Sequence, residues 1–357
     1  MAPRVLIMAG GTGGHVFPAL AVALELQQRG ATVSWLGTQR GLEAEVIPKA
    51  GIDIDWVTIG GLRGKGLLGW LMAPLRLSRA MAQTYRVFRV RKPSVVLGMG
   101  GFVTGPGGLV AWLSGTPLVI HEQNALPGMT NRWLARIATR VLTAFPVAFD
   151  HRQTRDVGNP IRSTLTHLPA PDQRFAGRTE GALHLLVVGG SLGAKALNDT
   201  VPAALALLPV VQRHQVWHQT GKKNLVAAQA TYAQAGVEGR VVPFIDDMAE
   251  AYAWADLVIC RAGALTISEL AAVGVGAILV PFPHAVDDHQ TVNAKYLADC
   301  GAALLVPQTQ LSAEKLAAML RDLNREKLLA MARKARHVAR PHATAQVADV
   351  CQEVARV

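Results

Sequence analysis

One pattern occurs twice in this sequence: an apolar run that leads directly into a glycine-rich turn. The first copy covers residues 5–15 and the second covers residues 185–195. Glycines let the backbone approach a ligand closely, and the helix that follows each turn offers unpaired N–H groups at its positive end. The repeat therefore predicts two α/β domains with one anion-binding loop each, and a ligand held between them.

The length and the composition agree with this organisation. The chain has 357 residues, which is too long for one core and suits two domains. Half of the residues are hydrophobic but only 5% are aromatic, which is typical of aliphatic helices packed on parallel sheets. Cys260, Cys300 and Cys351 are odd in number and form no C-x-x-C pair, so free thiols in a reducing compartment are expected.

Neither a signal peptide nor a membrane span is expected. The apolar run before Gly10 is shorter than the core of a signal peptide. Residues 94–120 carry no charge, yet glycines and prolines interrupt them, which argues against a spanning helix. The expectation is a soluble or peripheral protein.

The net charge is +11, and basic residues gather where acidic ones are missing. Between Asp55 and Glu122 the sequence has no acidic residue. The basic residues of this interval are Arg63, Lys65, Arg76, Arg79, Arg86, Arg89, Arg91 and Lys92, with Leu67, Leu68, Trp70, Leu71 and Met72 among the first of them. Exposed Leu and Trp inside a basic rim favour an anionic membrane surface as partner. The alternative is a solvated helix face with its Leu and Trp in the core. No motif supports binding of nucleic acid.

Strand and helix patterns alternate along the chain, which predicts parallel sheets with right-handed crossovers. The expected strands cover residues 33–36, 95–99 and 117–120 in the first half, and lie near residues 183–188, 215–218, 241–242, 256–259 and 277–280 in the second. The expected helices cover residues 16–28 and 41–50 and begin near Thr104 and Met129.

The alternation pauses near Ile161, where a polar, proline-containing stretch begins that runs to about Gly181. This pause predicts two domains, one of residues 1–161 with residues 341–357, and one of residues 162–340. By analogy with other proteins that contain two such sheets, the last helix is expected to cross back onto the first domain.

The glycine turns do not fit a nicotinamide dinucleotide site. The first turn lacks the third glycine of G-x-G-x-x-G at the required offset, and no acidic residue closes the strand at residues 33–36. A further glycine cluster, at residues 100–108, follows another expected strand of the first domain. Two glycine loops on the carboxyl edge of one sheet predict that this domain takes a second phosphorylated substrate.

Six motifs, three of them glycine loops, make a family resemblance specific. They are Gly10-Gly11-Thr12-Gly13-Gly14-His15, Gly100-Gly101-Phe102-Val103-Thr104-Gly105-Pro106, His121-Glu122-Gln123-Asn124, Gly158-Asn159-Pro160-Ile161-Arg162, Gly189-Gly190-Ser191-x-Gly193-Ala194 and Arg261-x-Gly263-Ala264-Leu265-Thr266-Ile267-Ser268-Glu269. In this order, and over nearly the whole chain, they resemble the MurG family. These bacterial N-acetylglucosaminyltransferases convert lipid I to lipid II in peptidoglycan synthesis.

The resemblance implies a GT-B fold: two Rossmann-like, parallel-sheet domains with an inter-domain cleft. The second domain would bind the donor UDP-N-acetylglucosamine (UDP-GlcNAc), and the first would bind the acceptor, undecaprenyl-diphospho-N-acetylmuramoyl (MurNAc)-pentapeptide. The implied reaction is inverting transfer of GlcNAc to the C4 hydroxyl of MurNAc, with no cofactor and no metal, at the cytoplasmic face of the inner membrane. Cell-wall biogenesis, cell shape and cell division would depend on it.

The matching positions give the implied substrate-binding residues. Ser191 and its glycine neighbours would donate hydrogen bonds to the UDP phosphates, and Glu269 would accept them from the ribose diol. Ile245 would contact the uracil through its main chain, and the helix that begins at Ala264 would face the nucleotide sugar. The remaining residues of this set are Thr12, Gly13, Gly14, Asn124, Arg162, Leu265, Thr266, Ile267, Ser268 and Gln290.

His15 is the predicted catalytic base. The attacking hydroxyl must lose its proton, and an imidazole that titrates near pH 6.5 suits this task at cytoplasmic pH. The alternative for His15 is a residue at a helix N-terminus that orders the loop or contacts phosphate. His121 and Glu122 form a second candidate pair, for which orientation of the acceptor is the expected role.

Three local features need their own interpretation. Leu192 and His289 stand where the family usually has glutamine, which leaves the local donor contacts open. Asp53-Ile54-Asp55 has the D-x-D form of metal sites in other glycosyltransferases. It lies in a strand-like stretch with no glycine loop after it, so a solvated strand face is the interpretation. Loop N–H groups, helix dipoles and Arg162 would stabilise the leaving group in place of a metal.

Other functions stay open at this point. A diacylglycerol glycosyltransferase of the same fold would share the donor loops but not the muramoyl acceptor. A UDP-sugar epimerase would need no lipid-facing patch. A non-catalytic subunit of a membrane complex would bind the sugar nucleotide and release no UDP.

Overall fold

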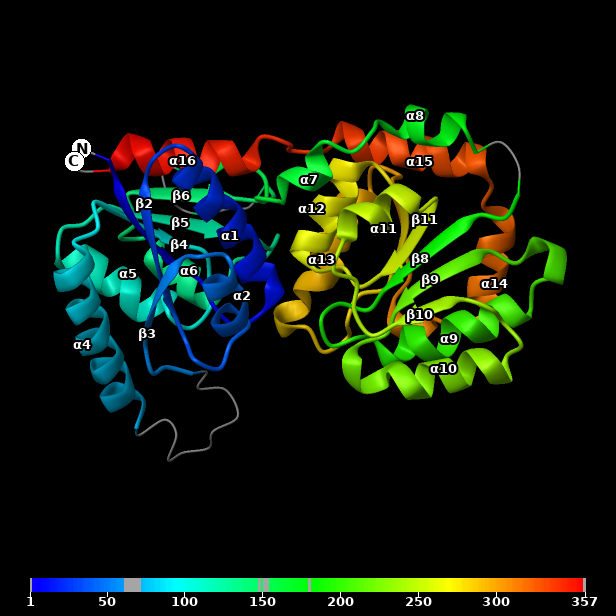
Figure 1. Ribbon diagram of the computed structural model, residues 1–357, viewed down its shortest axis with the longest axis horizontal. Coiled ribbons are helices and arrows are strands. Elements are labelled where there is room, and N and C mark those ends of the chain that lie inside the picture. The colour runs from blue at the N-terminus through cyan, green and yellow to red at the C-terminus, as the bar shows by residue number, and fades with distance from the viewer. Residues whose placement is uncertain (1, 61–71, 147–148, 150–153, 179–180, 356–357) are drawn as a thin grey trace. The chain divides into compact units, whose positions relative to one another are not determined.

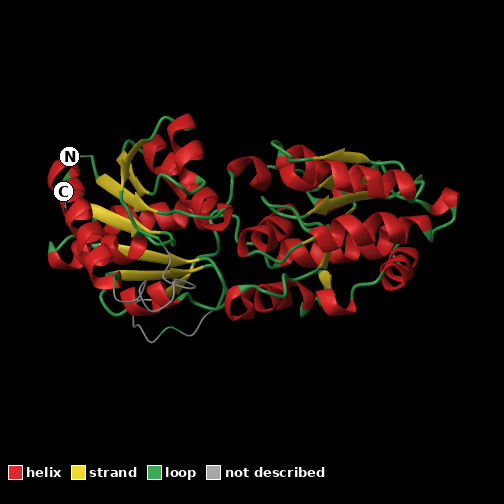
Figure 2. Ribbon diagram, turned by 90° about the horizontal axis from the view of Figure 1, so that it is seen from below, coloured by secondary structure: helices red, strands yellow, loops and turns green. Residues whose placement is uncertain are grey.

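The computed structural model describes residues 2–60, 72–146, 149, 154–178 and 181–355, and the chain divides into two compact units (Figure 1). The first unit contains Met1–Arg162 and Pro341–Val357, and the second contains Ser163–Arg340. Each unit is built on its own parallel sheet, and Figure 2 shows the strands in yellow with red helices packed on them.

In the first unit, the described residues form a seven-stranded sheet in the order β3-β2-β1-β4-β5-β6-β7, with all neighbouring strands parallel. The strands are β1 (Arg4–Met8), β2 (Thr32–Gly37), β3 (Asp53–Trp56), β4 (Val95–Gly98), β5 (Leu118–Glu122), β6 (Arg140–Thr143) and β7 (Thr154–Asp156). The helices are α1 (Gly13–Gln28), α2 (Glu43–Lys49), α4 (Ala73–Arg91), α5 (Thr104–Leu113), α6 (Met129–Leu134) and α16 (Ala343–Val354).

Both faces of this sheet are buried, because successive residues of a strand point to opposite sides. On β1, Val5 and Ile7 join the core that contains residues of α1 and α16, whereas Leu6 and Met8 join the core that contains residues of α4 and α5. The C-terminal helix α16 packs along α1, where Arg29 forms an ion pair with Asp349.

In the second unit, the described residues form a six-stranded sheet in the order β10-β9-β8-β11-β12-β13, again entirely parallel. The strands are β8 (His184–Val188), β9 (Gln215–Gln219), β10 (Arg240–Val242), β11 (Leu257–Cys260), β12 (Gly276–Leu279) and β13 (Ala303–Leu305). The α-helices are α7 (Ser163–Thr166), α8 (Pro171–Ala176), α9 (Lys195–Ala206), α10 (Leu225–Gln234), α11 (Met248–Trp254), α12 (Ala264–Val273), α13 (His289–Ala298), α14 (Ala313–Asp322) and α15 (Arg325–His337). Short 3-10 turns are η1 (Val210–Gln212), η2 (Lys222–Asn224), η3 (Val286–Asp288) and η4 (Gln308–Gln310).

The two sheets share one topological feature that positions the candidate site. In each, the chain leaves the first strand in one direction across the sheet and later returns to the other side of it, so that β1 borders β4 and β8 borders β11. At such a switch point, the loops that follow the two neighbouring strands diverge at the carboxyl edge, where α/β proteins bind ligands. The predicted α/β class with two Rossmann-like sheets is confirmed.

Candidate active site

The switch point of the first unit brings together two glycine loops. Residues 9–12 follow β1, and residues 99–103 follow β4. Gly101 has a φ of +88°, and a Cβ atom at this position would lie 2.4 Å from the carbonyl oxygen of Gly10. Gly100, with a φ of +98°, leaves no room either, since its Cβ would lie 2.5 Å from Nδ1 of His15. These glycines of the second loop are therefore required for its packing against the first loop and against His15.

His15 lies half-buried in the first turn of α1, beside this contact. Its Nδ1 is 3.1 Å from Oε1 of Gln123, and Nε2 of Gln123 donates to the carbonyl oxygen of Met99 at 2.8 Å. Thr12, the N-cap residue of α1, makes no side-chain cap. Its φ and ψ are extended, and the helix N-terminus that follows carries the N–H groups that can bind an anion.

A buried carboxylate supports the first glycine loop. Glu43, at the start of α2, has no exposed surface and accepts hydrogen bonds from the backbone N–H of Gly11 at 2.9 Å and of Thr38 at 3.0 Å. The hydroxyl of Thr38 donates to the same carboxylate at 2.7 Å. Glu43 thus connects the loop after β1 with the loop after β2. The sequence interpretation missed this residue, whose acidic character in the first turn of a short helix gave no signal of a distant partner.

The carboxylate of Glu122 is used within the loop after β5, where it accepts hydrogen bonds from residues of that loop and of α6. Its Oε1 accepts hydrogen bonds from the backbone and side-chain nitrogens of Asn124, and its Oε2 accepts them from Gly128 N and Asn131 Nδ2. The residue is 2% exposed. The two bonds from Asn124 orient this residue in the loop after β5.

His121 is also buried within the first unit. Its Nε2 lies 2.9 Å from the carbonyl oxygen of Gly158, which can only accept, so Nε2 carries the hydrogen. Burial, with a smaller contribution from the nearby His15, lowers the pKa of His121 to about 4. The ring is therefore neutral at neutral pH. Arg162, at the end of the first unit, lies with its guanidinium carbon 5.4 Å from the ring centroid of Phe17 on α1.

The switch point of the second unit carries the third glycine loop. A Cβ atom on Gly193, whose φ is +76°, would lie 1.8 Å from the carbonyl oxygen of Thr220, so the loop after β8 packs directly on the loop after β9. Gln219 Nε2 donates to the carbonyl oxygen of Gly190 at 3.0 Å, and Asn224 Nδ2 donates to that of Leu192 at 3.2 Å. The bracing role of these amides was not predicted from the sequence.

Ser191 lies at the exposed tip of this braced loop. The neighbouring Leu192 is 85% exposed, so the leucine projects from the loop without disturbing the hydrogen bond that its own carbonyl accepts. The loop backbone can therefore adopt this conformation with leucine at the position where the resemblance led us to expect glutamine.

α12 begins at the other side of the same switch point. Its N-cap, Gly263, is extended and makes no side-chain cap. In the predicted run, Ala264, Ile267 and Glu269 are buried, whereas Leu265, Thr266 and Ser268 are partly exposed. The Ser268 hydroxyl donates to the carbonyl oxygen of Ala264 at 3.0 Å, and the Tyr252 hydroxyl donates to Oε2 of Glu269 at 3.1 Å.

Gln290 lies in the first turn of α13 and joins two loops of this edge. Its Oε1 accepts hydrogen bonds from Ala262 N at 3.2 Å and from Phe282 N at 2.9 Å, which ties the chain after β11 to the chain after β12. The neighbouring His289 is partly exposed. Ile245 is 5% exposed and follows β10, the outermost strand, so it shares the edge but lies two strands from β8.

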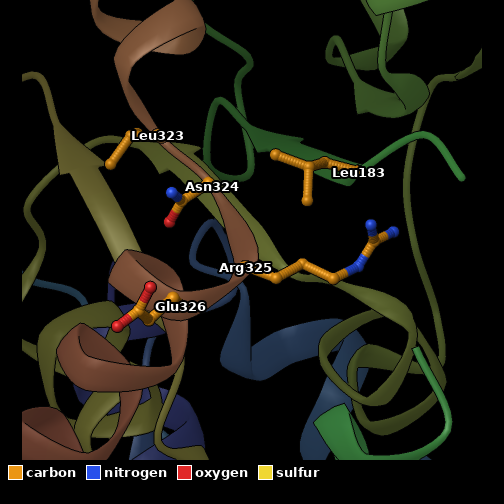
Figure 3. A pocket seen from close by; sticks show the side chains of 5 residues that line it. All are labelled: Leu183, Leu323, Asn324, Arg325 and Glu326. Carbon is orange, nitrogen blue, oxygen red and sulfur yellow. The ribbon is translucent and has the colours of Figure 1, made fainter. Parts of the chain in front are cut away.

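The predicted site residues thus form two groups, each at the switch point or the carboxyl edge of one sheet. Their roles in binding and catalysis stay predictions. A hollow of about 430 Å³ in the second unit contains none of them. It is lined by Leu183, Leu323, Asn324, Arg325 and Glu326 (Figure 3). Leu183 precedes β8, so this hollow lies at the amino edge of the sheet, opposite the glycine loop.

The D-x-D sequence is engaged by an arginine. Nη1 of Arg91 donates to Asp53 Oδ2 at 2.8 Å, and Nε of Arg91 donates to Asp55 Oδ2 at the same distance. Both carboxylates share one face of β3, as the sequence pattern indicated, and Arg91 of α4 compensates part of their negative charge. Within the described part of the chain, no group of three or more His, Cys, Asp or Glu side chains could hold a metal ion. None of the helices described there is long and apolar enough to cross a bilayer.

Comparison with known proteins identifies the family. The model of the glycosyltransferase family 28 N-terminal domain matches residues 5–143, and that of the family 28 C-terminal domain matches residues 184–354. The chain is 58% identical to a UDP-N-acetylglucosamine--N-acetylmuramyl-(pentapeptide) pyrophosphoryl-undecaprenol N-acetylglucosamine transferase of Marinobacter nauticus, over 99% of this chain and 98% of the relative. The chain belongs to the MurG family of glycosyltransferases.

A second curated relative and a solved structure agree with this assignment. A transferase of the same name from Nitrosococcus oceani is 56% identical, and the match covers 99% of each chain. The crystal structure of MurG from Acinetobacter baumannii has a TM-score of 0.83 and 44% sequence identity, and covers 98% of this chain and 99% of that one. The predicted MurG resemblance, the GT-B type of fold and the glycosyltransferase class are confirmed.

Proposed function

We propose that this chain transfers GlcNAc from UDP-GlcNAc to the C4 hydroxyl of MurNAc in undecaprenyl-diphospho-MurNAc-pentapeptide, the step from lipid I to lipid II in peptidoglycan synthesis. The observation that carries the proposal is the 58% identity, over almost the whole of both chains, to a relative whose name specifies this donor and this acceptor. Cell-wall biogenesis, and through it cell shape and division, would depend on the product.

The second unit is the proposed donor site. Support comes from the braced, exposed loop around Ser191 and the uncapped start of α12 at Gly263, which are the two sides of one switch point. Loop N–H groups and a helix N-terminus stabilise a diphosphate whose negative charge grows as the glycosidic bond breaks. Glu269, held by Tyr252, would accept hydrogen bonds from the ribose diol. Gln290 and Ile245 would complete the donor contacts.

The first unit is the proposed acceptor site, with His15 as the base. The C4 hydroxyl oxygen of MurNAc attacks the anomeric carbon of GlcNAc, the bond from that carbon to the phosphate oxygen breaks, and its electron pair leaves with UDP. The hydroxyl proton passes to Nε2 of His15. Thr12, Gly13 and Gly14 at the α1 N-terminus would hold the acceptor diphosphate, and Asn124 and Arg162 would contact the substrates. The attack occurs from the face opposite the leaving group, so the configuration inverts.

A membrane-facing surface on the first unit is proposed from its exposed residues, and we assign it to the cytoplasmic face of the inner membrane. α4 and α6 both pack against α5. The exposed apolar residues of these helices include Leu75, Trp112, Leu113, Met129 and Trp133, and the basic residues on or beside them include Arg76, Arg79, Arg132 and Arg136. The Arg136 guanidinium lies 4.4 Å from the Trp133 ring centroid. Each basic residue near an anionic leaflet contributes about 1 kcal/mol of attraction.

The predicted membrane patch extends beyond the residues that the structure describes. Arg63, Lys65, Leu67, Leu68, Trp70 and Leu71 lie outside the described residues. Met72 is described and is partly exposed at the start of α4. Arg91, by contrast, is paired with Asp53 and Asp55, so its charge is already compensated.

The deciding experiment offers labelled UDP-GlcNAc or UDP-glucose together with lipid I, with and without EDTA, and measures glycosylated lipid and UDP together. With UDP-GlcNAc and lipid I we expect equal amounts of lipid II and UDP, and with UDP-glucose we expect neither. EDTA should not change the rate. Transfer to diacylglycerol but not to lipid I would identify the related lipid glycosyltransferase instead. Binding of UDP-GlcNAc without release of UDP would indicate a non-catalytic subunit. Loss of activity in EDTA would contradict the metal-independent mechanism.

A further inference from the structure

We propose that Gln123 is a positioning residue that holds His15 in the tautomer with its hydrogen on Nδ1, so that the basic lone pair lies on Nε2. The tautomer follows from hydrogen bonds within the first unit. Only its kinetic consequence rests on the proposed function of His15 as the base.

The orientation of the Gln123 amide is determined by a backbone carbonyl. One end of the amide lies 2.8 Å from the carbonyl oxygen of Met99, which can accept a hydrogen bond but cannot donate one. This end must therefore be the NH2 group. The flipped amide would set two oxygens against each other at this distance, and Gln123 is 1% exposed, so bulk water does not relieve the repulsion.

The other end of the amide then determines the state of His15. Oε1 of Gln123 can only accept, and it lies 3.1 Å from Nδ1 of His15. Nδ1 must carry the hydrogen for this contact to be a hydrogen bond, and in a neutral imidazole Nε2 is then the acceptor. Gly100 packs against the Nδ1 and Cε1 side of the ring, where no Cβ would fit. The ring is therefore constrained by an amide and by the second glycine loop together.

The charged and titratable groups on the surrounding elements include Glu43 of α2, His121 and Glu122 of β5, and Arg162 after β7. Glu43 accepts from Gly11 and Thr38, and Glu122 is saturated by four donors. Among the described residues, neither carboxylate hydrogen-bonds His15, and His121 is neutral at neutral pH. The partner that sets the tautomer is thus an uncharged amide, which orients the ring without the electrostatic stabilisation that a carboxylate would give to the imidazolium.

The direct test is the ¹⁵N spectrum of the full chain labelled at histidine, with the His15 signals assigned from their loss in His15→Asn. We expect a pyrrole-type Nδ1 and a pyridine-type Nε2 in the wild type. In Gln123→Met, which keeps the length but not the acceptor, the signals should move toward the Nε2–H tautomer that free histidine prefers. A pyridine-type Nδ1 in the wild type, or an unchanged tautomer in Gln123→Met, would overturn the proposal.

Kinetics separate this inference from the proposed function. Gln123→Met should lower kcat about 10-fold or more, while the KM for UDP-GlcNAc changes by no more than about twofold. Should the spectra agree with the proposal while His15→Asn stays active, the tautomer stands and the catalytic role of His15 fails. Should His15→Asn be inactive and the wild-type tautomer be reversed, the function stands and this inference fails. Thermal unfolding of Gln123→Met, compared with that of the wild type, checks that the first unit of the variant is folded.

Discussion

At the scale of single residues, the catalytic proposal is concentrated on one imidazole. His15→Ala should lower kcat by a factor of about 100 to 10,000, because the attacking hydroxyl then has no positioned base. UDP binding should remain, since the proposed donor contacts lie on the second unit. The measurement is steady-state turnover with lipid I beside calorimetric titration with UDP. His337→Ala, on the exposed surface of α15, is the matched control, and a His15→Ala enzyme as active as this control would exclude the base assignment.

The residues that could be predicted from the sequence are those whose chemistry shows in their local motif. Ser191 stands in a glycine loop, His15 in the helix turn directly after one, and Glu269 in the helical run that begins at Ala264. The supporting residues could not be found in this way. Glu43 meets Gly11 across 32 positions, and Gln123 meets His15 across 108, so only the folded sheet brings each pair together.

At the scale of elements, the buried strands were predicted to within one or two residues, because continuous apolar runs bounded by glycine or proline leave few alternatives. The short strands β6, β7 and β13 were not predicted. β7 in particular, Thr154–Asp156, has no apolar residue, and its strand conformation depends on pairing with β6. Propensity carries little information where a neighbouring strand decides the conformation.

Arg174 should be a major contributor to the stability of the second unit. It is 8% exposed, and its guanidinium donates to the carbonyl oxygens of Tyr252, Val273 and Gly274, at or near the C-terminal ends of α11 and α12. Burial lowers its pKa to about 10, so it remains charged at neutral pH and complements two helix dipoles. We expect Arg174→Met to reduce the free energy of unfolding by about 2–4 kcal/mol, because buried carbonyls lose their donors.

Arg333→Met is the matched control for this measurement by urea denaturation. Arg333 pairs with Asp172 of α8, the helix that also carries Arg174, but both partners are exposed. Such an exposed pair contributes little to stability, because water and salt screen it. An equal decrease in the free energy of unfolding in the two variants would show that the contacts of Arg174 with the helix ends do not stabilise the second unit.

The helices α5 and α6 allow the membrane surface to be tested. Replacing both Trp112 and Trp133 by serine should weaken binding to vesicles that contain anionic lipid by about 10-fold or more, because indole rings insert at the interface. The matched control replaces Val210 and Val211, exposed apolar residues of the second unit, by serine. Co-sedimentation at several lipid concentrations gives both affinities. Equal binding by the tryptophan variant and the control would place the membrane contact elsewhere.

At the scale of the whole molecule, two buried histidines, one in each unit, should make the protein sensitive to acid. Burial lowers the pKa of His121 to about 4 and that of His218 to about 3, whereas both titrate near pH 6.5 in the unfolded chain. Above pH 6.5 both histidines are neutral in the folded and in the unfolded chain, so their titration does not reduce stability. Below it the unfolded state binds protons that the folded state does not, so stability falls with pH.

For each histidine, we therefore expect the free energy of unfolding to fall by about 2 kcal/mol when the pH is lowered from 8 to 5. Urea denaturation at the two pH values measures the loss. In His218→Gln the loss within the second unit should shrink by about 2 kcal/mol, because glutamine does not titrate. The same loss in this variant as in the wild type would refute the assignment to His218.

The interlocked glycine loops of the first unit have a consequence for protein engineering. Gly10 and Gly101 touch backbone to backbone, although ninety-one positions separate them in the chain, and His15 sits against the same contact. A designer who wishes to change acceptor preference should treat the two loops together, because a side chain at Gly101 would collide with the backbone of Gly10. Both loops should be exchanged together, and Gln123, whose amide orients the imidazole of His15, should be retained.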